Sequence, residues 1–106
     1  MKILLDESVP VQVKSALAGH QVSTVSELGW KGRENGALLT AAEQAGFEVF
    51  ILADKNLRYQ QNLSGRKIAL VELWTNHRPT LEKHYPLIAS AVPGIGSGEY
   101  KIVSKP

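Results

Sequence analysis

Three carboxylates are placed where they could form a reactive site. Each lies at the end of an expected strand or at the start of an expected helix. Asp6 and Asp54 each follow a short apolar run, and Glu34 begins an amphipathic stretch. Carboxylates that converge repel one another unless a cation offsets their charge, and hard cations such as Mg²⁺ or Mn²⁺ prefer oxygen ligands. A cation held in this way activates water and offsets the charge of a phosphodiester during hydrolysis.

The elements that must position these acids follow from the hydrophobic pattern. Short apolar runs alternate with amphipathic stretches, which is typical of an α/β fold. Strands are expected over 3–5, 21–25, 49–53, 68–73 and 99–103, and helices over 10–18, 34–45 and 79–91. The third run has no polar alternation, which indicates a strand covered on both faces. We therefore expect a three-layer α/β sandwich around a mainly parallel sheet of four to five strands.

This architecture would bring the three acids together. In an open parallel sheet, ligands bind beyond the carboxyl ends of the strands, where Asp6 and Asp54 would both lie. Glu34 would reach the same edge if its helix belongs to a right-handed crossover. The pattern alone also allows scattered surface acids, or another acidic-site chemistry.

Basic and polar residues follow the third acid. A phosphate backbone entering the site would meet Lys55 and Arg58, and Tyr59 could stack on a base. The amide of Asn56 can bind a ligand or a metal-bound water. Solvated charges at a helix end, with the tyrosine half-buried, explain the same residues equally well. Ser8 could hydrogen-bond near the metal, although we expect it to cap the helix that follows.

Composition limits the class of protein. A length of 106 residues predicts a single domain that spans residues 1–106. Within it, we expect residues 93–98 to be a flexible connector to the last strand. It has no cysteine, which excludes a disulfide scaffold, a zinc–thiolate site and a thiol nucleophile. No apolar run approaches a membrane span, and the sequence opens on a strand with no room for a signal peptide, so we expect a cytoplasmic protein.

Charge is unevenly distributed along the chain. Four basic and six acidic residues precede Asp54, whereas eight basic and four acidic residues lie from Asp54 onward. A mildly basic half suits contact with a phosphate backbone, and an ordinary solvated surface accounts for it as well. Apolar residues such as Trp74, Tyr85 and Ile95 could serve a homodimer if they are exposed.

Three segments carry a family resemblance. MKILLDESVP, GRENGALLTAAEQAG and VFILADKNLRYQQN resemble the small PIN-like domains of bacteria, a branch often found as the toxin of toxin–antitoxin pairs. The resemblance runs from Met1 to about Leu73. It implies a PIN-like (Rossmann-like) fold and a Mg²⁺- or Mn²⁺-dependent ribonuclease whose metal-binding and catalytic carboxylates match Asp6, Glu34 and Asp54. It also implies an RNA substrate and a cognate antitoxin protein.

The sequence departs from this family at several positions. Leu52 stands where a threonine or serine is common, and Asn56 where many relatives have a further aspartate. Glu72 lies inside an expected strand and does not present an obvious fourth acid. One alternative is therefore a catalytically degenerate module that acts through a protein partner. Another is a receiver-like domain in which Asp54 accepts a phosphoryl group, with Thr75 and Lys101 only loosely placed for it.

Overall fold

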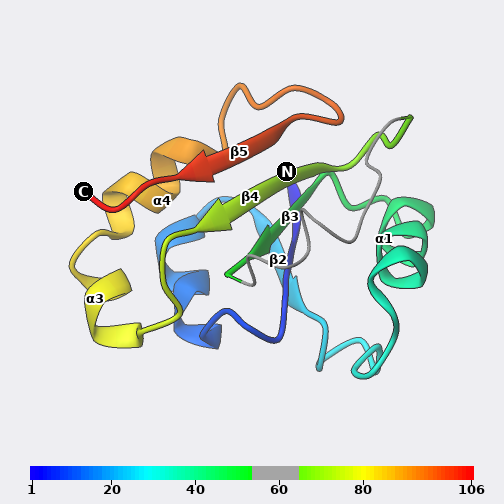
Figure 1. Cartoon of the computed structure of the whole chain (residues 1–106), viewed down its shortest axis with the longest axis horizontal. Helices are drawn as coiled ribbons and strands as arrows, with labels where there is room; N and C mark the ends of the chain where they lie inside the picture. The colour runs from blue at the N-terminus through cyan, green and yellow to red at the C-terminus, as the bar shows by residue number, and fades with distance from the viewer. Residues whose placement is uncertain (54–64) are drawn as a thin grey trace.

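A five-stranded sheet forms the centre of the molecule, in a computed structural model that describes residues 1–53 and 65–106. The strands are β1 (Lys2–Leu5), β2 (Gln21–Thr24), β3 (Val49–Leu52), β4 (Ala69–Leu73) and β5 (Tyr100–Val103). Their order is β2-β1-β3-β4-β5, and each neighbouring pair is parallel (Figure 1). The prediction of an α/β fold with a mainly parallel sheet is confirmed.

Helices cover both faces of this sheet, as Figure 1 shows. The helices are α1 (Asn35–Gln44), η1 (Val11–Leu17), α3 (Arg78–Glu82) and α4 (Tyr85–Ala91). α1 packs on one face, where its buried leucines and alanine join one core cluster. η1, α3 and α4 pack on the other face and contribute to a second cluster. The arrangement is the expected three-layer sandwich.

The central strands supply side chains to both clusters in alternation. Leu4 and Phe50 belong to the cluster under α1, whereas Ile3 and Ile51 belong to the cluster under η1, α3 and α4. Each of these side chains is at most 2% exposed. Because both faces are covered, β1 and β3 consist of apolar residues wherever they cross the core, and this explains the absence of polar alternation in the sequence.

The helices on the second face differ in detail from the expected ones. The segment expected as a helix over 10–18 forms the 3-10 helix η1, with Pro10 at the position before its first residue. The expected helix over 79–91 is two short helices, and Pro86 lies in the first turn of the second, α4. Proline is favoured there because its missing N–H has no helical partner to lose. Pro86 therefore marks a second helix start.

α1 is held to the start of β4 by an ion pair that the sequence did not reveal. The Arg66 guanidinium donates to Glu43 Oε1 at 2.8 Å, and the Lys67 N–H donates to Glu43 Oε2 at 2.7 Å. Burial by itself raises the pKa of Glu43, but the hydrogen bonds from Lys67 and Arg66 outweigh it and hold the pKa below its usual value. The carboxylate therefore stabilises the folded state in its charged form.

Glu43→Gln is expected to lower the free energy of unfolding by about 1–2 kcal/mol at neutral pH, because three donors lose a charged acceptor. The loss should shrink as the pH falls below 4.5, where the unfolded chain already binds the proton, and vanish below the depressed folded pKa. Urea unfolding at several pH values measures both effects. Glu82→Gln, in the exposed pair with Arg78, is the matched control and should cost under about 0.5 kcal/mol. Equal costs for the two variants would contradict this role of Glu43.

Within residues 1–53 and 65–106, no helix is both long enough and apolar enough to cross a lipid bilayer.

Candidate functional site

Asp6 lies at the carboxyl edge of the sheet, where the neighbouring strands β1 and β3 end. It directly follows β1, and its N–H donates to the carbonyl oxygen of Ile51 in β3 at 2.9 Å. In the order β2-β1-β3-β4-β5 the chain turns from β1 to β2 on one side and reaches β3 on the other. This junction is the switch point of an open parallel sheet, where the two connections diverge and leave a crevice for ligands.

The side chain of Asp6 is fixed by Ser8. The Ser8 hydroxyl donates to Asp6 Oδ2 at 2.6 Å, and the Ser8 N–H donates to the same oxygen at 3.2 Å. The hydroxyl oxygen also accepts the N–H of Ala53 at 3.0 Å. Ser8 therefore links the Asp6 carboxylate to the residue just before Asp54. Asp6 Oδ1 has no hydrogen-bond partner within residues 1–53 and 65–106, so one carboxylate oxygen is available to a ligand.

Ser8 thus has a different role from the expected one. No side chain caps η1, whose N-cap position is Pro10, so the expectation of a capping serine is wrong. The physical reason is that the turn after β1 places the hydroxyl between two strand ends, where it satisfies a carboxylate and a backbone N–H together. An aspartate followed by a serine two residues later is the local signal that could have indicated this arrangement.

The loop before α1 approaches the same edge. The N–H of Gly32 donates to Glu7 Oε1 at 3.4 Å, which brings this loop against the neighbour of Asp6. Gly32 has a φ of 87°, a conformation that a residue with a Cβ adopts only with strain. α1 runs back between two parallel strands, so it begins at their carboxyl edge. The structure therefore brings Glu34, two residues after Gly32, to the side of the sheet that carries Asp6.

Glu34 itself precedes α1 and is exposed. Its carbonyl oxygen accepts the N–H of Leu38 at 2.8 Å, while its side chain makes no capping hydrogen bond. The Glu34 carboxylate is therefore not used to cap α1. Nearby, the guanidinium of Arg33 lies 5.3 Å from the ring centre of Trp30, and that ring packs edge-on against Phe47 at 6.1 Å. Trp30 thus anchors the loop to the core cluster under α1.

The other predicted site residues lie outside the described part of the chain. They are Asp54, Lys55, Asn56, Arg58 and Tyr59. Among residues 1–53 and 65–106, no group of three or more histidine, cysteine, aspartate or glutamate side chains could hold a metal ion. Because the predicted set contains Asp54, the three-carboxylate site stays a prediction.

A further carboxylate is buried beside this edge. Glu72 is 2% exposed and lies opposite Leu52, the last residue of β3, in the strand register. The Tyr100 hydroxyl donates to Glu72 Oε1 at 2.6 Å. Glu72 lies on the same face of β4 as Leu70, which belongs to the cluster under α1. In the sequence, this carboxylate is visible only as an acid inside an otherwise apolar strand, and the strand pattern does not determine which way the side chain points.

Comparisons of the chain with protein-family models, with curated proteins and with solved structures find no match.

Proposed function

We propose that the chain is a PIN-like ribonuclease that hydrolyses phosphodiester bonds with Mg²⁺ or Mn²⁺ bound by Asp6, Glu34 and Asp54. The observation that carries the proposal is the Asp6 carboxylate, fixed by Ser8 at the junction of β1 and β3 with one oxygen left for a ligand. Carboxylate oxygens of this kind fit a hard divalent cation. A bound cation would lower the pKa of a water molecule and offset the charge on the phosphodiester.

The chain's own residues would prepare the substrate for attack. Ser8 holds Asp6 in one orientation, which reduces the reorganisation needed when a cation binds. Lys55 and Arg58 would bind the phosphate backbone, since an ammonium and a guanidinium neutralise phosphate charge. Tyr59 would stack on a base, and the Asn56 amide would bind a ligand or a metal-bound water.

The proposal extends to partners. A ribonuclease of this type would be held inactive by a cognate antitoxin protein that covers the acidic edge. Of the apolar residues considered for a homodimer, Trp74, Tyr85 and Ile95 are partly buried against the core cluster under η1, α3 and α4.

RNA cleavage by the purified chain tests the proposal. Cleavage of a mixed single-stranded RNA should require millimolar Mg²⁺ or Mn²⁺, cease with excess EDTA and return when Mn²⁺ is restored. Calorimetric titration should show Mn²⁺ binding to the protein without RNA. Cleavage that continues unchanged in EDTA would exclude the proposed chemistry. The absence of both Mn²⁺ binding and cleavage would favour the degenerate module that acts through a protein partner.

A receiver-like phosphoacceptor is a second candidate, which the strand order favours because doubly wound receivers share the order β2-β1-β3-β4-β5. Two observations weigh against it. The Lys101 ammonium donates to the carbonyl oxygen of Ala91 at 3.0 Å, and the Thr75 hydroxyl accepts the N–H of His77 at 3.1 Å. Both groups are thus engaged by neighbouring backbone. Labelling of Asp54 by acetyl phosphate would support this candidate and count against the ribonuclease.

A further inference from the structure

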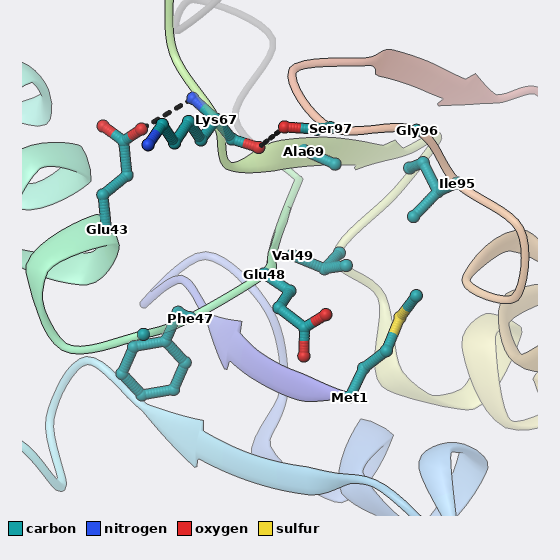
Figure 2. A pocket seen from close by; sticks show the side chains of 11 residues that line it. Met1, Glu43, Phe47, Glu48, Val49, Lys67, Ala69, Ile95, Gly96 and Ser97 are labelled. Atoms are coloured by element: carbon teal, nitrogen blue, oxygen red, sulfur yellow. Dashed lines mark hydrogen bonds between the residues drawn. The ribbon is translucent and has the colours of Figure 1, made fainter.

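A cavity of about 320 Å³ opens at the amino edge of the sheet, at the opposite ends of the strands from Asp6 (Figure 2). Val49 and Ala69, the first residues of β3 and β4, line it together with the side chains of Met1 and Ile95. These groups make its floor apolar. Ligand pockets in proteins begin at roughly 300 Å³, so the cavity has room for a small molecule.

Two turns that border the cavity are fixed by hydrogen bonds. On the side of β5, the N–H of Gly98 and the hydroxyl of Ser97 both donate to the carbonyl oxygen of Lys67, at 2.9 and 2.8 Å. On the side of α1, the N–H of Gly46 donates to the carbonyl oxygen of Glu43 at 3.1 Å. The cavity is therefore formed before any ligand arrives, and binding would not need to order its walls.

Glu48 places a carboxylate over the apolar floor. Figure 2 shows its side chain projecting between Val49 and Met1. Its Oε1 accepts the N–H of Lys2 at 3.2 Å. The Lys2 ammonium instead donates to the carbonyl oxygen of Ala45 and lies 4.6 Å from the ring centre of Phe47. Within residues 1–53 and 65–106, no cationic side chain pairs with Glu48.

The lysine side chain that lines the cavity does not pair with Glu48. Lys67 lines the cavity, and Figure 2 shows its side chain running toward Glu43, away from Glu48. Glu43 in turn is paired with Arg66 at 2.8 Å. The amino group of Met1, whose side chain also lines the cavity, lies 3.1 Å from Nδ1 of His20. Among residues 1–53 and 65–106, the side-chain charge that projects over the apolar floor is thus the negative charge of Glu48, with which no ion pair forms.

We propose that this cavity binds an organic ammonium ion with an apolar body. The Glu48 carboxylate would accept the N–H groups of the ammonium, and Val49, Ala69 and Ile95 would contact its hydrocarbon part. A carboxylate that is covered by an apolar ligand loses water contacts, and only a cation replaces them with charge-assisted hydrogen bonds. Neutral and anionic ligands of the same shape would lose this compensation. The site is separate from the proposed nuclease site.

Binding of three hexyl compounds tests the assignment. Hexylammonium, hexanol and hexanoate share one apolar body and differ in charge. Titration of the full chain, followed by the NMR methyl signals of Val49, Ala69 and Ile95, should show saturable binding of hexylammonium. Hexanol should bind about tenfold or more weakly, and hexanoate should not bind. Glu48→Gln should weaken hexylammonium binding about tenfold or more, because the amide keeps the Lys2 hydrogen bond but removes the charge.

Glu82→Gln, which neutralises an exposed carboxylate on α3, is the matched control and should leave hexylammonium binding unchanged. Thermal melts should be alike for both variants, because each changes an exposed side chain. Equal affinities for hexanol and hexylammonium, or an unchanged affinity in Glu48→Gln, would overturn the proposal. If hexanoate binds and Lys67→Gln abolishes that binding, the proposal is also overturned, because the cavity would then be a site for anions. Failure of all three compounds to bind would show that the cavity is not a site for this class.

Discussion

Asp6→Asn is expected to reduce metal-dependent RNA cleavage by about 100-fold or more while the free energy of unfolding changes by less than about 1 kcal/mol. An asparagine side-chain oxygen can still accept hydrogen bonds from the N–H and hydroxyl of Ser8, so the turn should keep its shape. It cannot supply the negative charge that a divalent cation requires. Initial cleavage rates at saturating RNA and Mn²⁺, with urea unfolding of the same samples, measure both quantities.

Two further variants make this experiment specific. Ser8→Ala leaves the Asp6 charge but removes its orienting hydroxyl, so it should weaken Mn²⁺ affinity by about 10- to 100-fold rather than abolish binding. Glu99→Gln neutralises a carboxylate next to the start of β5, at the other edge of the sheet, and should leave cleavage unchanged. Cleavage by Asp6→Asn at the wild-type rate would remove Asp6 from the proposed site.

Gly98→Ala is expected to lower the free energy of unfolding by about 2–4 kcal/mol. Gly98 has a φ of 74°, and an added Cβ would lie 2.6 Å from the carbonyl oxygen of Arg66. That oxygen is backbone and cannot rotate away as a flexible side chain could. The strain would also disturb the hydrogen bond from the Gly98 N–H to the Lys67 carbonyl, which attaches the turn before β5 to the chain entering β4.

Gly94→Ala separates steric overlap from backbone strain. Gly94 has a φ of 77°, but an added Cβ there would meet no atom within 4 Å. This variant should therefore cost only about 1–2 kcal/mol, the strain of a left-handed conformation. Urea unfolding of the two variants provides the comparison. If Gly98→Ala is no less stable than Gly94→Ala, the close approach to Arg66 does not hold in solution.

The strands were the most predictable part of the fold. The runs 3–5 and 49–53 contain only apolar residues, and residues 3–5 and 49–52 form strands buried on two faces, because parallel strands between two helical layers have no solvent side. The helix expected over 34–45 forms as α1 (Asn35–Gln44), and Gly46 follows it with a positive φ of 86°, which suits the turn after a helix. The order of the strands in the sheet could not be predicted from the hydrophobic pattern, because the apolar pattern of a strand does not identify its neighbours.

The candidate site was less predictable, because it depends on contacts between distant segments. Asp6 could be expected at the carboxyl edge from its place after β1 alone. Its link through Ser8 to Ala53 depends on β1 and β3 being neighbours, which the order of the sheet decides. The Tyr100–Glu72 hydrogen bond likewise depends on β5 lying beside β4. An acid within a strand carries no sign of which partner it will meet.

The interior position of β1 in the sheet affects how a nascent chain acquires this structure. β1 is synthesised first, yet it pairs with β2 on one side and with β3, which begins at Val49, on the other. Until that later strand has left the ribosome, the apolar residues of β1 have only part of their native cover. Most of the sheet must therefore form late in synthesis or after release, and such long-range pairing slows folding compared with helical proteins of similar length.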